Sequence, residues 1–183
     1  MFLGQSECTS GFMSRDRVRD LNRVVGGSLR TRERQQRIIP AINFTCSGLI
    51  NKWTVAAKWN GGGMHVNFPQ LEIWRIQSAG SNVYNRVGST LTEGAVEHES
   101  EIYEFFPSPG PPLQFEPGDI LGVFNPRRPR LGIYYVDTIG PPNYHTTGEG
   151  TSPSTTSFTI SGNTRSQNDL PLITVDTSEL LHA

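Results

Sequence analysis

The chain has 183 residues, a formal net charge of −1 and a hydrophobic content of 35%, enough for one domain with its own core. Only 18% of the residues are charged, and glycine and proline together number 32 (19 plus 13), a composition typical of short strands joined by many turns. It contains no run of about eighteen apolar residues, so we expect no membrane insertion by this segment.

Basic residues are concentrated at the start of the chain. Residues 1–40 carry eight arginines against four acids, whereas residues 41–183 carry eight bases against thirteen acids. The basic stretch 15–34 has no aromatic residue to stack on bases and is interrupted by acids, so we expect no nucleic-acid binding. We interpret residues 1–36 as a basic leader that is poorly ordered, loosely docked or partly helical.

The most informative motif is a glycosylation sequon, Asn43-Phe44-Thr45, followed at once by Cys46. Read with a period of two, Ile42, Phe44 and Cys46 share one face of a strand, and Asn43 and Thr45 share the other. The acceptor nitrogen would then point to solvent, as glycosylation requires. The motif therefore predicts glycosylation at Asn43 and an extracellular or cell-surface location.

The chain has two cysteines, Cys8 and Cys46. A disulfide between them would tie the leader to the first strand and contribute about 4 kcal/mol in the chain-entropy model. Two reduced, buried cysteines are the alternative. Neither a CxxC pair nor a Cys/His cluster is present, so we predict no metal site, and we expect no cofactor.

The beginning of the chain does not agree with export. Residues 1–5 (Met-Phe-Leu-Gly-Gln) lack the continuous apolar segment of a secretory signal. We therefore expect that the chain is a piece of a larger protein or starts at an incorrect position, with the export signal and any membrane anchor elsewhere.

From Ile38 onward, short alternating segments are separated by turns. Strands are predicted at 38–46, 49–59, 69–76, 82–87 (an edge strand), 95–106, 131–137, 155–160 and 170–175, with two more in 113–124 around a type II turn at Pro117-Gly118. Trp53, Val55 and Ala57 share one buried face. The segment 69–76 is apolar on both faces, as in a central strand covered on each side.

Three loops are expected between these strands, at 60–68, 125–130 and 140–154. About ten short strands without a repeat and without alternating helices predict an all-β fold, an antiparallel two-sheet sandwich that is jelly-roll-like. We assign the sandwich to residues 37–177 and a tail to residues 178–183.

Three motifs carry a family resemblance: IIPAINFTCSG (38–48), PQLEIWR (69–75) and LQFEPGDILGVF (113–124). Together with Trp53 and Tyr134-Tyr135 they resemble an uncharacterised extracellular β-sandwich ectodomain of receptor-like proteins from early-branching animals. The resemblance covers roughly residues 37–176. It implies export and a cell-surface or secreted setting, but no established activity.

An enzymatic site is not predicted. The four histidines are scattered in the sequence, and no GxSxG motif occurs (His65, His98, His145 and His182). Paired carboxylates for glycoside hydrolysis could come from the glutamates of residues 93–104, but Glu97, Glu99 and Glu101 share one strand face, which is typical of a solvated side. A hydrolase is the distant alternative.

Calcium is a further alternative, because carboxylates occur near predicted strand ends (Glu116, Asp119, Asp137 and Glu149). No DxDxDG loop is present. Asp119 directly follows the Pro117-Gly118 turn, and we interpret its carboxylate as an acceptor for the backbone amides of that turn.

Recognition is the function that remains. Trp53, Trp59 and Trp74 are expected in the core, and the tyrosines at 84, 134, 135 and 144 are better suited to a contact surface. Loops of a sandwich usually carry its binding residues, and we predict ligand contacts from Arg127, Arg128, Arg130, Tyr144 and His145. The sequence thus predicts the ligand-binding or adhesion ectodomain of a larger protein, with a protein or glycan partner. A carbohydrate-binding module, with or without calcium, is the alternative.

Overall fold

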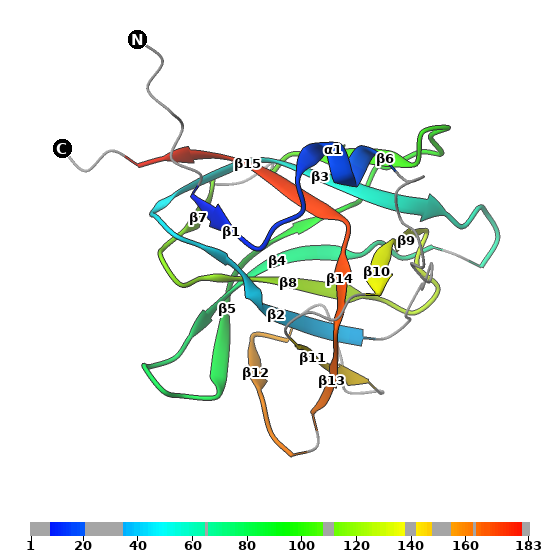
Figure 1. The fold of residues 1–183 in the computed structure, drawn as a ribbon. Coiled ribbons are helices and arrows are strands. Elements are labelled where there is room, and N and C mark those ends of the chain that lie inside the picture. The colour runs from blue at the N-terminus through cyan, green and yellow to red at the C-terminus, as the bar shows by residue number, and fades with distance from the viewer. Residues whose placement is uncertain are drawn as a thin grey trace, which may run out of the picture.

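The computed structural model describes residues 8–20, 35–64, 66–107, 112–137, 142–147, 155–162 and 164–180. Within these ranges the chain forms strands β1 to β15 and one short helix, α1 (Figure 1). The predicted fold class, an all-β antiparallel sandwich, is confirmed. No helix in these ranges has the length and apolar character needed to cross a membrane.

The larger sheet has eight strands, all paired antiparallel. Its order is β12 (Ser157–Thr159), β5 (Val83–Leu91), β4 (Gln70–Ile76), β8 (Ile120–Asn125), β2 (Gln35–Phe44), β11 (Asn143–Thr147) and β13 (Arg165–Gln167), with β1 (Thr9–Ser10) beside the end of β2. β12 and β13 lie at the two ends of this order, yet only residues 160–164 connect them along the chain. Because so short a connection cannot cross the width of a flat sheet of this size, the sheet is curled.

The second sheet is built on one long strand, β3 (Gly48–Trp59). Along one edge, β3 pairs with β15 (Ile173–Glu179); along the opposite edge it pairs with β7 (Leu113–Phe115) and β6 (Ile102–Phe105). β9 (Leu131–Ile133) pairs with the end of β3, and β10 (Tyr135–Asp137) forms a separate pair with β14 (Asp169–Pro171).

The two sheets enclose one main core, as the alternating pattern predicted. Trp53, Val55 and Ala57 of β3 face Leu71 and Ile73 of β4 there, and all five are at most 1% exposed. Phe44 stacks on Phe115 with ring centroids 4.2 Å apart. Burial of these side chains at about 25 cal/mol per Å² is the main force that holds the sheets together.

A second apolar cluster covers the other face of the large sheet. It contains Ile38, Trp74, Ile120 and Phe158. The ring of Trp74 lies against Gly122, where a Cβ would overlap the indole. β4 therefore has buried apolar side chains on both faces, which confirms the prediction for a central strand.

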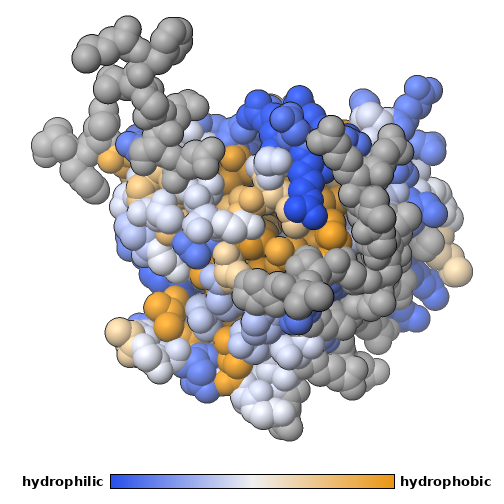
Figure 2. All heavy atoms as spheres, viewed as in Figure 1, coloured by the Kyte–Doolittle hydropathy of each residue, from blue (hydrophilic) through white to orange (hydrophobic). Residues whose placement is uncertain are grey.

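The leader is partly helical in the range that the structure describes. α1 (Arg15–Arg19) is capped by the side chain of Ser14, which accepts a hydrogen bond from the amide of Arg17. Val18 is fully buried in an apolar cluster on the outer face of the second sheet, with Met13, Ala56, Tyr134, Val136 and Leu172. Figure 2 shows the charged side chains of α1 beside hydrophobic residues of this layer.

Several predicted elements differ from the observed ones. Residues 95–106 were expected to form one strand, but only Ile102–Phe105 does, because the chain before it turns sharply and Glu101 has a positive φ of 55°. The predicted edge strand at 82–87 is the longer β5, paired on both sides. The predicted strand at 131–137 divides into β9 and β10, and β15 extends to Glu179.

The predicted disulfide between Cys8 and Cys46 is present. It lies next to the pairing of β1 with the end of β2, so it fastens the described part of the leader to the large sheet. Cys8 is 2% exposed and belongs to the main core.

One ionisable side chain lies beside the second cluster. Glu72 is fully buried and accepts hydrogen bonds from Gln36 Nε2 (2.6 Å) and Trp74 Nε1 (2.8 Å), and Arg86 Nη1 lies 3.1 Å from its carboxylate. Burial raises the pKa of Glu72 above the ordinary value of 4.5, and its hydrogen bonds and the charge of Arg86 offset only part of this effect.

Replacement of both cysteines by serine (C8S/C46S) should lower the free energy of unfolding by about 4 kcal/mol, because the reduced unfolded chain regains the entropy of an open loop. Urea unfolding of the double variant, compared with the oxidised parent, measures the difference. Equal stability of the two proteins would contradict the expectation.

The stability of the protein should also depend on the ionisation of Glu72. Above about pH 4.5 the native carboxyl keeps a proton that the unfolded chain has lost, so the unfolding free energy falls as the pH rises through this window. Glu72→Gln cannot titrate. In urea unfolding, the unfolding free energy of the parent minus that of the variant should therefore decrease as the pH rises above about 4.5. A constant or increasing difference would show that the native pKa is not raised.

Candidate functional site

Two of the predicted recognition loops lie together. Asn67 Nδ2 donates to the carbonyl of Arg127 (2.8 Å) and Asn60 Nδ2 to that of Pro129 (2.8 Å), so loop 60–68 holds loop 125–130. Arg127 is exposed and Arg128 is half-buried with a φ of 51°. The guanidinium of Arg130 lies 5.7 Å from the ring centre of Trp59. This loop pair is a compact basic surface.

The other two predicted contact residues are not on a loop. Residues 140–154 were expected to form a surface loop, but β11 lies within them, and Tyr144 and His145 pair with Ile38 and Arg37 of β2. His145 is only 2% exposed, and Tyr144 packs partly against the second apolar cluster. His145 is therefore buried, and Tyr144 is half-buried in a sheet instead of lying on a loop. Tyr134 and Tyr135 are also buried, at 4% and 0% exposure.

The sequon lies where its alternation predicted. Ile42 and Phe44 are fully buried, whereas Asn43 is half-buried and Thr45 is exposed. Asn43 pairs with Ser10 of β1 on one side and with Ile120 of β8 on the other. Its side chain thus leaves the sheet on the face away from the main core.

The carboxylate of Asp119 is used by the protein itself. It accepts the amide of Glu116 (2.8 Å), as interpreted from the sequence, and two hydrogen bonds from Arg75 at 2.7 and 2.9 Å. Gly118 has a φ of 90° and Asp119 N–H bonds the carbonyl of Glu116, which confirms the predicted tight turn. Of the other calcium candidates, Glu149 lies outside the described residues.

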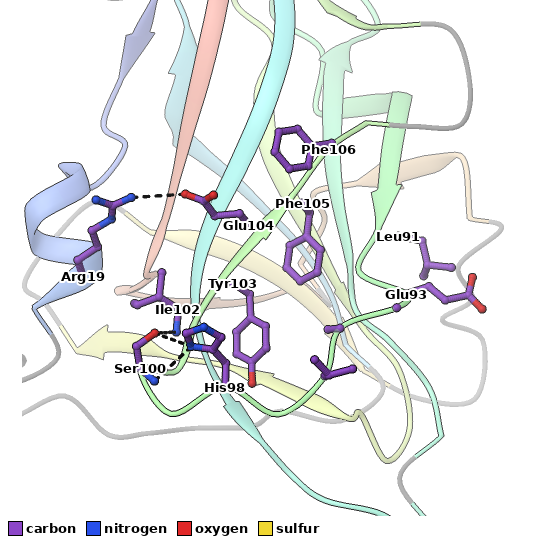
Figure 3. Close-up of a pocket in the computed structure, with 13 residues that line it drawn as sticks. Arg19, Leu91, Glu93, His98, Ser100, Ile102, Tyr103, Glu104, Phe105 and Phe106 are labelled. Atoms are coloured by element: carbon purple, nitrogen blue, oxygen red, sulfur yellow. Dashed lines mark hydrogen bonds and ion pairs between the residues drawn. The ribbon is translucent and has the colours of Figure 1, made fainter.

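A groove of about 850 Å³ lies beside β6, and we call it the edge groove (Figure 3). One side is β6 with the following Phe106. The opposite side is the end of β5 followed by the segment 92–101. We call this segment the wall. Tyr103 and Phe105 come from the β6 side and are almost buried, and Leu91 and Glu93 lie across from them.

The rim of the edge groove is unusually apolar. Leu91, Val96 and Phe106 are 44%, 72% and 61% exposed, and all three line it. They are three of the seven large hydrophobic side chains that the described surface exposes, and they come from both sides of the groove. Large apolar side chains that gather on a surface mark an interaction site more often than scattered ones do.

β6 is the last strand of its sheet, and the edge groove follows its outer edge. The amide of Ala57 donates to the carbonyl of Glu101 (2.9 Å), and in an antiparallel pair such bonded positions recur at every second residue. Tyr103 and Phe105 therefore direct their backbone groups to β3, whereas Ile102 and Glu104 direct theirs away from it.

The outward backbone groups of β6 are only partly used. Ser100 Oγ accepts the amide of Ile102 (3.3 Å), and no backbone or side-chain group in the described ranges bonds the amide or carbonyl of Glu104. An edge with such groups can pair with another strand.

The wall is fixed at both ends. Thr92 bonds the carbonyl of Pro69 through both its amide (3.1 Å) and its hydroxyl (2.9 Å). At the other end, Tyr134 donates to Glu101 Oε2 (2.6 Å), and burial and then this contact raise the pKa of Tyr134, so its hydroxyl keeps its proton. The edge groove is therefore largely preformed.

The turn at the foot of the wall contains a serine and a histidine in contact. Ser100 Oγ lies 2.7 Å from His98 Nδ1, and the amide of Ser100 also bonds that nitrogen (3.3 Å). Among the described residues no carboxylate contacts the His98 ring, so the orienting third group of a hydrolytic triad is lacking. The same contacts close a local turn.

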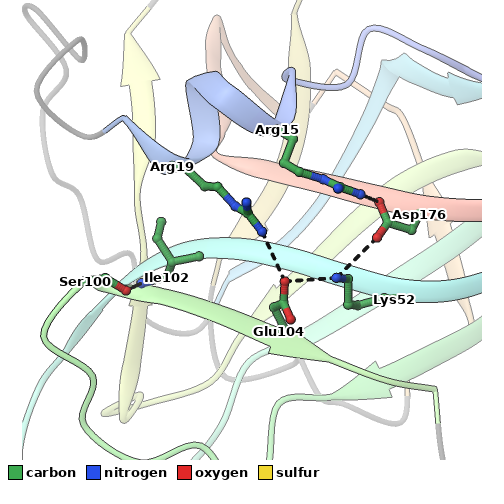
Figure 4. A network of polar contacts seen from close by, with 7 residues as sticks. All are labelled: Arg15, Arg19, Lys52, Ser100, Ile102, Glu104 and Asp176. Carbon is green, nitrogen blue, oxygen red and sulfur yellow. Dashed lines mark hydrogen bonds and ion pairs between the residues drawn. The ribbon is translucent and has the colours of Figure 1, made fainter.

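Charge is unevenly distributed around the edge groove. Residues 87–126 contain seven acids and no lysine or arginine. Glu104 is held by Lys52 (2.9 Å) and Arg19 (3.4 Å) on the outer face of the sheet, and Lys52 and Arg15 also contact Asp176 (Figure 4). The hydrogen bond to Glu104 is the main reason that the pKa of Lys52 is raised. Glu93, Glu97 and Glu99 are exposed and take part in no ion pair with a described residue.

Sequence reasoning missed the edge groove. The glutamate-rich run was interpreted as the solvated face of one long strand, and the groove exists because that strand is interrupted. Gly94 and the exposed Val96 within this run were the available signals, since a glycine and an apolar residue between glutamates do not suit a simple polar face.

Comparison with known proteins gave no match: no family model, no curated protein and no solved structure is significantly similar to the chain.

The role of Asp119 can be tested against calcium binding. Asp119→Asn should lower the unfolding free energy by about 2 kcal/mol, because it removes the charge of a buried carboxylate that accepts hydrogen bonds from the partly exposed Arg75. Addition of EDTA at fixed pH should leave the melting temperature unchanged, because protein donors already occupy both carboxylate oxygens. Glu116→Gln is the control, since Glu116 contacts Arg75 from an exposed position. A melting temperature lowered by EDTA would reveal a calcium site instead.

Proposed function

We propose that the chain is an extracellular, non-enzymatic recognition module that binds a protein partner through the edge groove. The observation that carries the proposal is the gathering of Leu91, Val96 and Phe106 around a preformed groove. Their burial against a partner would release water from apolar surface, which is the main source of affinity in protein complexes.

The extracellular setting is supported by two features. The disulfide between Cys8 and Cys46 needs an oxidising compartment to form and persist. Within the sequon Asn43 is half-buried and Thr45 is exposed, so the acceptor side chain is partly accessible to solvent, as a glycan acceptor must be. A cell-surface or secreted location accounts for both.

A protein partner suits the edge groove better than a glycan does. Sugars are commonly held on an exposed aromatic ring, but Trp53 and Trp74 are fully buried and the guanidinium of Arg130 lies over Trp59. The rim of the edge groove is instead mainly aliphatic, with one exposed phenylalanine. Aliphatic side chains contribute to protein contacts through apolar burial.

The proposal is tested with a pair of variants at exposed hydrophobic residues. Phe106→Asp changes the rim of the edge groove, and Met64→Asp changes an equally exposed position on loop 60–68. Neither should alter stability by more than about 0.5 kcal/mol, because both side chains are mostly in solvent. An array of purified extracellular proteins and a glycan array are probed with the parent and both variants.

We expect a protein ligand that binds the parent and Met64→Asp equally and Phe106→Asp at least about tenfold more weakly. Arg127→Ala should behave like Met64→Asp. Loss of binding in Arg127→Ala with Phe106→Asp unaffected would place recognition on the arginine loop. Hits on the glycan array alone would establish a carbohydrate-binding module in place of the proposed function.

A further inference from the structure

We infer that the edge groove takes an extended, lysine- or arginine-bearing segment of the partner, which adds to the second sheet as a strand beside β6. The inference rests on the proposed function and specifies the chemistry of the ligand. It follows from three properties of the edge groove, namely its backbone groups, its floor and its charge.

The backbone groups favour an extended ligand. The amide and carbonyl of Glu104 and the carbonyl of Ile102 point away from β3, and the edge groove is lined by every residue from Ile102 to Phe106. A peptide strand about 4.8 Å from β6 could donate to and accept from these groups. Addition of a strand to an open sheet edge is an established mode of peptide recognition.

The floor of the edge groove favours a peptide with alternating side chains. We call the apolar surface formed by Tyr103 and Phe105, which are two residues apart, the floor. Ala95 and Val96 of the wall lie along it. In an extended ligand every second side chain would meet this apolar floor, and the side chains between them would point outward.

The charge selects the ligand. Glu93, Glu97 and Glu99 belong to the wall and form no ion pair with a described residue, and Glu93 lines the edge groove. Arg19 also lines the groove, but its charge is paired with Glu104. Cations on the outward side chains of the peptide would lie close to these carboxylates. A second copy of the chain paired through β6 would instead bring two sets of glutamates together, which disfavours self-association.

The test uses a synthetic probe with the chemistry of the inferred ligand. It is an acetylated decapeptide of alternating lysine and valine, and the control peptide has glutamate in place of lysine. Binding to the full chain is measured by fluorescence anisotropy at low and at physiological salt. We expect saturable binding of the lysine peptide, weakened by salt, and at least about tenfold weaker binding of the glutamate peptide.

A matched pair of variants isolates the backbone contact. Glu104→Ala and Glu104→Pro both remove the carboxylate, but only proline removes the outward amide, and its ring also blocks a neighbouring strand. The amide of Glu104 does not bond β3, so proline should be tolerated there; circular dichroism and melting temperature check folding. The lysine peptide should bind Glu104→Pro at least about tenfold more weakly than Glu104→Ala.

Amide exchange gives a second measurement on the parent protein, independent of any variant. Exchange at Glu104 and Phe106 should slow when the lysine peptide binds, while Tyr103 and Phe105, whose amides point to β3, should change little. Equal binding of the peptide to both Glu104 variants, unchanged exchange at Glu104, or equal binding of the two peptides would overturn the inference. If Phe106→Asp still abolishes binding of a protein ligand in that case, the proposed function stands without strand addition.

Discussion

The hydrogen bonding of β3 is the constraint on which the rest of the structure depends. Its twelve residues pair with β15 along one edge, while the opposite edge is shared between two short strands, β7 and β6. β3 also contributes Trp53, Val55 and Ala57 to the main core. One strand therefore fixes both the separation of the two sheets and the place where the second sheet ends. Because β6 has only four residues and no further neighbour in the described sheet, this end is open.

The edge groove is a direct consequence of that open end. Tyr103 and Phe105 of β6 face the space between the two sheets, and they line the edge groove. Both are buried, and the wall beside them is bonded to Pro69 at one end and to Tyr134 at the other. The apolar side chains left in contact with water are those of the rim, Leu91, Val96 and Phe106.

Charge is arranged differently on the two faces of this edge. On the outer face, Arg15, Arg19 and Lys52 neutralise Glu104 and Asp176 and help to dock α1. On the wall, the glutamates lack such counterions in the described structure. Their mutual repulsion is small in water, so the fold tolerates it. The acids of the outer face are therefore paired within the chain, whereas the exposed glutamates of the wall are not paired with a described residue.

Local pattern was enough to predict the all-β class, the strands around Trp53 and Leu71, the Pro117-Gly118 turn and the outward direction of Asn43, because a period of two and a positive φ at glycine are properties of neighbouring residues. The disulfide was one of two open alternatives. Tertiary structure alone decided that Cys8 lies beside Cys46, that Tyr144 and His145 are in a sheet, and that β6 ends its sheet. Those outcomes depend on which strands pair across long sequence separations, and alternation is the same for an edge strand as for a central one.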